Sequence, residues 1–359
     1  MKSLRTIIVF AIVILTASVV RADMPDGRRQ NKMMDAINRY EGQRQEAVRQ
    51  ISTPAAGGQY SSGGAVSAGY DERLARKTFE FEGGYEDYRY KYEETVGGEH
   101  FMDLKSPHYR GFFGALTYAP PNPGEFVADL VTFYRFEGRM AWGKPDYNGA
   151  VVNLNTGEET PVRAKGARDF VFELRGVAGK DYWVKTFRIS PYAGLGYRHL
   201  RQNNDKEVSD TFDLEGLGYT RVSQYVYLPL GIDVKKALPA RSAIGLNVEF
   251  DWFLYGEQRS QFGGYAEMEG SGEIREFSEL RNKQREGYGL RGSVRFEKSL
   301  GSVDLVLEPF IRYWDIEKSE LAHFDVDETG TTDHDWVLLG ANEPSNTTKE
   351  AGVRAGLQF

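Results

Sequence analysis

The chain has 359 residues, with 52 acidic and 45 basic side chains, a formal net charge of -7 at pH 7, and no cysteine. The lack of cysteine excludes disulfides and thiolate metal sites, and the acidic balance argues against nucleic acid as a partner. Mean hydropathy is low. Such a value suits an exported soluble domain, or a membrane protein whose apolar residues occupy every second position.

A secretory signal peptide is predicted at residues 1–22. Lys2 and Arg5 precede an uncharged apolar run over residues 6–20, and Val20 and Ala22 occupy the small-residue positions expected before a cleavage point. The alternative, a membrane-anchoring helix, needs a longer apolar run.

Residues 23–52 predict one amphipathic helix, because apolar residues such as Met33, Ile37 and Tyr40 recur at three- and four-residue spacing. The helix would be a periplasmic contact, a plug or a self-association element, or else a solvated leader. Residues 53–76 are rich in Gly, Ser and Ala and predict a flexible linker.

From residue 77 to residue 359 apolar and polar residues alternate, which is the period of a β-strand. The pattern predicts about ten strands, several longer than the roughly 5–6 residues usual in globular sheets. The clearest examples lie near 126–142, 170–175, 244–254, 288–296, 305–313 and 351–359. Less regular ones lie at 188–200 and 219–233, and the weakest at 77–92 and 107–119.

The connections between these strands are predicted to alternate in length, as they do in transmembrane β-barrels. Short ones fall at 120–125, 178–183, 235–240 and 299–302, and long polar ones at 93–106, 143–166, 201–216, 257–283 and 317–346. In the first strand the apolar parity switches between Tyr85 and Tyr88, which predicts a β-bulge near Gly83 and Gly84.

Together with the signal peptide, this pattern resembles the bacterial outer-membrane β-barrel superfamily over residues 77–359. In that group a terminal aromatic residue forms part of the signal read by the barrel-insertion machinery, and Phe359, with Leu357 and Val353 behind it, fits this signal. The resemblance implies an all-β fold, an antiparallel transmembrane barrel of about 10 strands (range about 8–12). It also implies a location in the cell outer membrane, in contact with outer-membrane lipid.

The polar parity of the strands is predicted to face the lumen, because a charge on the lipid face costs roughly 2–4 kcal/mol near the bilayer midplane. Positive and negative side chains on this parity are nearly equal in number. In so narrow a barrel we expect a wet network of ion pairs and no open bore. Its predicted members are Asp129, Arg135, Glu137, Arg139, Asp169, Glu173, Arg175, Glu249, Asp251, Arg291, Arg295, Glu308, Arg312, Glu350 and Arg354, with Arg188 and Arg198 on the same parity.

A catalytic site is sought among the external loops, because the omptin proteases are ten-stranded barrels with acidic residues and a histidine at the outer rim. The last loop contains Asp333, His334 and Asp335, with His323 and Asp325 nearby. A carboxylate beside a histidine is able to orient it for water activation. However, no second carboxylate pair matching the family motif appears on another loop, so we expect no enzyme and keep an omptin-like surface hydrolase as the alternative.

Residues 325–330, "DVDETG", copy the first half of a calcium loop, but the twelfth position is Trp336 instead of Glu. We therefore expect no dedicated metal site and no cofactor. The leading hypothesis for function is a narrow or gated pore, or a structural or surface-interaction barrel. The solute and the surface ligand stay open. A soluble periplasmic β-sandwich is the third possibility.

Overall fold

The computed structural model describes residues 74–121, 130–152, 159–203, 220–261, 265–268, 273–277, 279–327 and 336–359. The predicted signal peptide, the amphipathic helix and the linker as far as residue 73 lie outside this range. Among the described residues, no helix is both long and apolar enough to cross a membrane.

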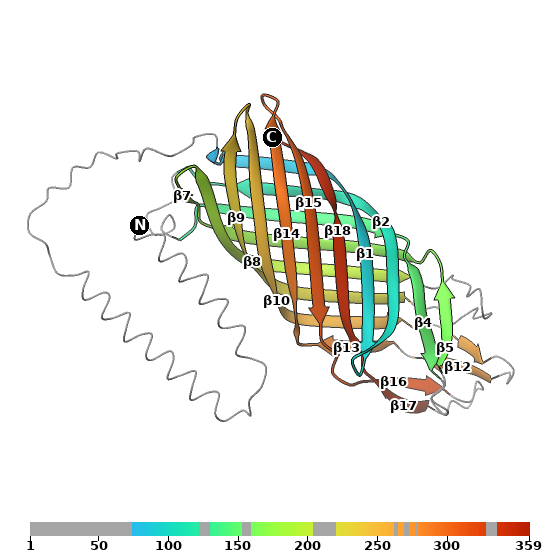
Figure 1. Ribbon diagram of the computed structural model, residues 1–359. Helices are drawn as coiled ribbons and strands as arrows, with labels where there is room; N and C mark the ends of the chain where they lie inside the picture. The colour runs from blue at the N-terminus through green and yellow to red at the C-terminus, as the bar shows by residue number, and fades with distance from the viewer. Residues whose placement is uncertain are drawn as a thin grey trace, which may run out of the picture. The chain divides into compact units, whose positions relative to one another are not determined.

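Ten antiparallel strands form a closed barrel (Figure 1). The order around the wall is β1-β18-β15-β14-β10-β9-β8-β6-β3-β2, and β2 pairs back with β1. The strands are β1 (Phe79–Val96), β2 (Glu99–Tyr118), β3 (Phe133–Gly143), β6 (Arg168–Gly179), β8 (Phe187–Asn203), β9 (Thr220–Leu238), β10 (Ser242–Gln261), β14 (Gly287–Ser299), β15 (Asp304–Ile316) and β18 (Ser345–Gln358). The predicted all-β barrel of about ten strands is confirmed.

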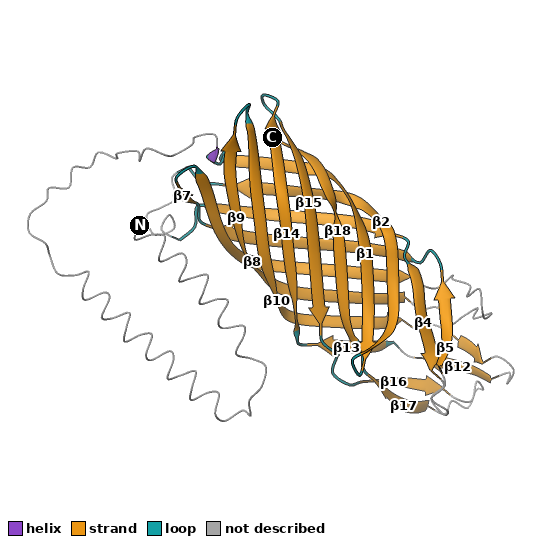
Figure 2. Ribbon diagram, viewed as in Figure 1, coloured by secondary structure: helices purple, strands orange, loops and turns teal. Residues whose placement is uncertain are grey.

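Eight shorter strands lie beyond the wall or at its ends (Figure 2). Four of them extend the barrel sheet: β4 (Asp146–Val152), β5 (Glu159–Ala164), β7 (Tyr182–Val184) and β13 (Leu280–Gln284). The other four form a separate sheet: β11 (Tyr265–Met268), β12 (Glu273–Phe277), β16 (Ala322–Asp327) and β17 (Trp336–Ala341). Most of these strands belong to connections that the sequence predicts as long, and they lie at the end of the barrel opposite the C-terminus.

The predicted long connection at 93–106 is wrong. β1 and β2 remain paired up to Val96 and Glu99, and only Gly97 and Gly98 form the turn between them. Both glycines have positive φ values, 62° and 89°, a conformation that a two-residue hairpin turn requires and that glycine adopts without a steric penalty. The polar residues of this stretch therefore belong to strands that continue beyond the membrane.

The predicted bulge near Gly83 and Gly84 is also wrong. β1 pairs with β18 in one unbroken register, and its pairing with β2 is unbroken through both glycines. One register shift lies between Tyr88 and Tyr90, opposite the extra residue that β2 carries at Pro107–His108, and a second lies between Glu94 and Thr95. Pro107 has no N–H to donate to the ladder, which favours a break in pairing at this point.

In the sequence pattern the apolar residues of β1 change face, but in the structure the same alternate residues face the lumen along the whole strand. Glu86, Tyr88, Tyr90 and Tyr92 are all buried inside the barrel, while the charged residues between the tyrosines point outward. The outer side of β1 is thus apolar as far as Tyr85 and polar beyond it. We interpret this boundary as the edge of the membrane.

The outer wall carries the apolar parity, as predicted. Its exposed large side chains include Leu195 at 56%, Phe112 and Val248 at 58%, Phe136 at 60% and Ile311 at 64%. An apolar surface of this extent is stable in lipid and not in water. The barrel therefore crosses a membrane with its strands.

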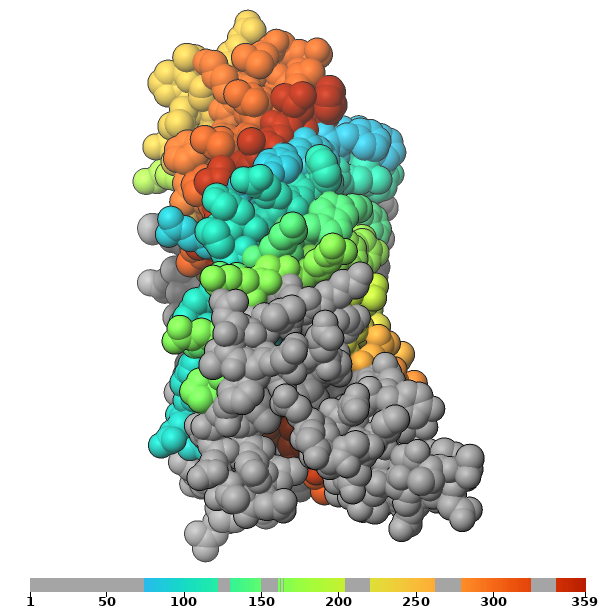
Figure 3. Space-filling model, turned by 90° about the vertical axis from the view of Figure 1, so that its right-hand side faces the viewer, coloured from blue at the N-terminus to red at the C-terminus, as the bar shows by residue number. Residues whose placement is uncertain are grey.

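The two ends of the barrel sequence meet at one seam. In the space-filling view, the red surface of β18 lies directly against the blue surface of β1 (Figure 3). The N–H of Phe359 donates to the carbonyl oxygen of Phe81 at 2.8 Å. The last residue of the chain therefore takes part in closing the wall.

Candidate functional site: the closed lumen

The middle of the lumen is filled by a network of arginines and carboxylates. Arg139 on β3 donates from Nε to Glu173 Oε2 at 2.6 Å, from Nη1 to Glu86 Oε1 at 3.2 Å, and from Nη2 to Glu350 Oε1 at 3.1 Å. All four side chains are at most 4% exposed. Charges buried this deeply are tolerated because each one is paired and hydrogen-bonded.

Members of the network connect opposite sides of the wall. Glu350 on β18 accepts hydrogen bonds from Arg198 Nη2 on β8 at 3.0 Å and from Arg312 Nη1 on β15 at 2.9 Å. β8 lies five steps from β18 in the strand order, which is half the circumference of a ten-stranded barrel. Arg291 on β14 likewise pairs with Glu173 on β6, four steps away. Direct pairs across the barrel leave no open bore at this level.

A second branch of the network continues from Arg291. Its Nε atom donates to Asp251 Oδ2 at 2.5 Å and lies 3.2 Å from Glu249 Oε1. Glu249 also pairs with Arg175, and Arg175 pairs with Glu137. The network therefore runs from β14 through β10 to β6 and β3 as a chain of alternating charges.

The structure brings nearly all of the predicted lumen residues together. Asp169 is buried but accepts a hydrogen bond from Tyr109 at 2.5 Å, and Asp129 lies outside the described residues. The described members with a carboxylate–arginine pair are Arg135, Glu137, Arg139, Glu173, Arg175, Glu249, Asp251, Arg291, Arg295, Glu308, Arg312, Glu350 and Arg354. Sequence reasoning did not include Glu86, whose carboxylate contacts three of these arginines.

On the predicted topology, in which short turns face the periplasm, the end of the barrel that holds the C-terminus is taken as the periplasmic end. A cavity of about 140 Å³ lies on this side of the network. Its lining includes Arg295, whose Nη1 atom is 2.8 Å from Glu82 Oε1 and 3.3 Å from Glu308 Oε2. A polar cavity of this volume has room for several water molecules. Within the network, Glu86, Glu249 and Glu350 are by contrast fully buried.

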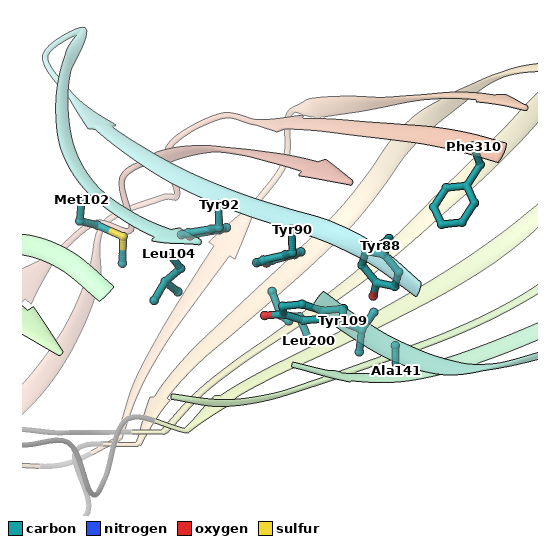
Figure 4. Close-up of a cluster of buried hydrophobic side chains, with 10 residues drawn as sticks. Tyr88, Tyr90, Tyr92, Met102, Leu104, Tyr109, Ala141, Leu200 and Phe310 are labelled. Atoms are coloured by element: carbon teal, nitrogen blue, oxygen red, sulfur yellow. The ribbon is translucent and has the colours of Figure 1, made fainter. Parts of the chain in front are cut away.

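An aromatic layer closes the other side of the network. Tyr90 stacks on Tyr109 with ring centroids 4.4 Å apart, and Tyr88 lies 5.4 Å from the same ring (Figure 4). Across the lumen, Tyr227 meets Trp314 edge-on at 5.0 Å. Sequence reasoning missed this layer. The signal that could have revealed it is that the tyrosines of β1 occupy the same alternate positions as the lumen-facing glutamates before them.

The periplasmic end of the barrel is covered by residues just before β1, within the predicted linker. Arg76 donates from Nε to Asp181 Oδ2 at 2.9 Å, and its guanidinium carbon lies 3.7 Å from the centre of the Phe133 ring. Arg188 donates to the carbonyl oxygen of the buried Leu74 at 2.5 Å. Burial raises the pKa of Asp181, but Arg76 and Arg188 outweigh this effect and hold it below its ordinary value.

The predicted catalytic and calcium-binding residues are only partly described. Asp333, His334 and Asp335 lie outside the described residues, as do the side chains of Asp325 and Asp327. His323 is exposed on β16. In the part of the chain that the structure describes, no three His, Asp or Glu side chains are grouped to hold a metal ion.

No protein-family model matches the chain, and no curated protein matches its sequence. Among solved structures, the outer membrane protease OmpT from Escherichia coli matches at a TM-score of 0.54 and 10% identity, over 78% of this chain and 95% of that one. The translocator domain of the autotransporter NalP from Neisseria meningitidis matches at a TM-score of 0.33 and 10% identity, over 91% and 97%. OprG from Pseudomonas aeruginosa matches at 0.28 and 9%, over 78% and 95%.

The closed ten-stranded wall and its apolar outer face define a transmembrane β-barrel. The fold is that of the bacterial outer-membrane β-barrels, as predicted. At 10% identity, the likeness to OmpT concerns the fold alone.

Proposed function

We propose that this outer-membrane barrel is closed to solutes and works through its extracellular part, as a structural or surface-interaction barrel. The observation that carries the proposal is the contact of Arg198 with Glu350 across the full width of the lumen. With the aromatic layer beside it, this contact leaves no path for a hydrated solute.

The energetics of the network support a lumen that stays closed. Separating one partner from a buried ion pair costs roughly 3–5 kcal/mol, and Arg139 and Glu350 each make several such contacts. A passage through the middle of the barrel would break more than one of them at once. Spontaneous opening is therefore expected to be rare.

The length of the strands supports a role outside the membrane. β1 has 18 residues, and β2 and β10 have 20 each, whereas roughly 9–11 tilted residues cross the hydrocarbon core. The extra length carries the barrel beyond the bilayer at the end where the second sheet lies (Figure 1). This part offers a broad surface for a ligand or partner.

Conductance in a planar bilayer tests the proposal. The purified full chain is expected to show no steady conductance, while the variant Arg198→Gln with Glu350→Gln should open more often. Lys349→Gln serves as the matched control, because its partner Glu93 lies on the outer face of β1 and the Lys349 side chain is 54% exposed. A large, stable conductance of the unmodified protein would refute the closed lumen and favour a diffusion pore.

The alternative is a surface hydrolase that uses His334. Among the described histidines, His108 lies 3.0 Å from Asp87 and His100 lies 3.3 Å from Asp103, and both imidazoles are exposed. Peptide cleavage by the unmodified protein that His334→Ala abolishes would establish the enzyme and reject the proposal above.

A further inference from the structure

The last extracellular excursion of the chain, residues 317–344, carries β16 and β17 and is fastened at its base. The N–H of Ser319 donates to the carbonyl oxygen of Glu343 at 3.0 Å, and the N–H of Glu343 donates to Ser319 Oγ at 2.8 Å. Asn282 on β13 donates to the same Oγ at 3.1 Å. The two legs of the excursion are therefore joined to each other and to the rim.

The side chain of Glu343 enters the mouth of the lumen from this base. Its Oε1 atom lies 3.5 Å from Nη1 of Arg221 on β9, and the same Nη1 pairs with Glu94 on β1. β1 and β9 are five steps apart in the strand order. Arg221 thus connects the excursion with opposite sides of the wall, and the three side chains are only 2–7% exposed.

This group of side chains carries unequal charge. Two carboxylates share one guanidinium, and the other groups that face Glu343, Tyr92 on β1 and Tyr225 on β9, are neutral phenols. Gln258 on β10 is also neutral. With both carboxylates ionised, one negative charge would be buried in excess, which is unfavourable in a medium of low dielectric constant.

We propose that Glu343, Arg221 and Glu94 form a proton-operated latch, which holds the base of the excursion (residues 317–321 and 341–344) at the rim of the barrel while Glu343 is protonated and loosens it when Glu343 is ionised. The proposal concerns the excursion and not the central network. A negative result in the latch test therefore leaves the proposal of a closed lumen unaffected. A negative result in the conductance test likewise leaves the latch unaffected.

The direction of the pH dependence follows from the pKa of Glu343. Burial, supported by the like charge of Glu94 and opposed by Arg221, raises this pKa from 4.5 to about 8. A pKa that is higher in the closed state means that the closed state binds the proton more tightly. The latch is therefore strongest below about pH 4.5, weakens as the pH rises, and is weakest above about pH 8.

Distance measurements between two spin labels test the latch in lipid vesicles. The chain has no cysteine, so Leu321→Cys in the excursion and Val96→Cys at the tip of β1 are the only attachment points. Both native side chains are exposed. The distribution of distances should be narrow at pH 5, and should gain a longer and broader component at pH 9.

Variants assign this change to the proposed group. Glu343→Gln cannot ionise, and Glu94→Gln leaves Arg221 free to neutralise Glu343, so both should keep the narrow distribution at pH 9. Glu320→Gln is the matched control, because it removes a carboxylate of the same excursion that is exposed and pairs with Arg285. The distance distribution of this control should broaden at pH 9, as that of the parent does.

Two results would overturn the proposal. One is a distribution in the parent that does not change between pH 5 and pH 9. The other is broadening at pH 9 that persists in Glu343→Gln or, if that variant does not assemble, in Glu94→Gln.

Discussion

Arg198 and Glu350 are joined by a hydrogen bond of 3.0 Å although their strands, β8 and β18, stand on opposite sides of the barrel. Two side chains therefore span the whole lumen. A contact of this kind blocks the passage at this level of the barrel.

Replacing Glu350 by Gln should destabilise the barrel strongly. Arg139, Arg198 and Arg312 would lose their shared carboxylate inside a buried site, and removing one partner of a buried charge pair costs roughly 3–5 kcal/mol. Urea unfolding in lipid vesicles measures the change. Glu320→Gln, which removes an exposed pair, should cost less than about 1 kcal/mol. Equal losses for the two variants would show that the network contributes no more than a surface pair.

Arg76→Ala should release the segment before β1 from the periplasmic end of the barrel. The side chain loses its pair with Asp181 and its contact with Phe133. The mobility of a spin label at the exposed Ala75 reports the release. Asp181→Asn should have a similar effect, and the double variant should add little to it, because both changes remove the same ion pair. Full additivity would mean that the two residues act independently.

The same contact should depend on pH in the opposite direction to the latch. The pKa of Asp181 is held below its ordinary value of 3.8, so the ionised form stabilises the docked segment. The label at Ala75 should be immobile at neutral pH and become mobile as the pH falls below about 3.8. Lys77→Ala, which alters an exposed neighbour, should leave this transition unchanged.

Membrane-impermeant thiol reagents should label the two ends of the barrel differently in intact cells. Leu321→Cys, in the last excursion, should react at once. Leu300→Cys, in the tight turn between β14 and β15, should react only after the outer membrane is opened. Both native residues are exposed, at 57% and 65%, so accessibility within the protein does not distinguish them. The reverse pattern would mean that the barrel is inserted the other way round.

Deleting Phe359 should impair assembly in cells more than it lowers stability in vitro. We expect the terminal aromatic to be read by the insertion machinery, while the folded barrel loses one ring and the hydrogen bond to Phe81. Surface levels in cells and urea unfolding of refolded protein separate the two effects. Phe81→Ala removes a lipid-facing ring of similar exposure and keeps the terminus. Equal surface levels for the two variants would contradict the signal.

The sequence by itself determined which side of each strand faces lipid. A strand has a period of two, and lipid rejects charge strongly, so Arg139 and Glu173 had to point inward while Phe136 and Leu174 pointed outward. The same pattern predicted about ten strands and most of the described members of the lumen network, although not Glu86. These properties depend only on residues that are neighbours along the chain.

The tertiary structure decided which charges meet. Arg198 and Glu350 are 152 residues apart, and their contact depends on the register of every strand pair between β8 and β18, which local alternation does not encode. It also decided the surroundings of Tyr88, Tyr90 and Tyr92. An aromatic side chain is stable both in lipid and in a packed lumen, so local alternation does not show which of the two surrounds it. For this reason the sequence predicted a bulge at the point where the strand leaves the membrane. The burial of Glu343 is also decided by the tertiary structure, because it arises only when the base of the excursion packs against the rim.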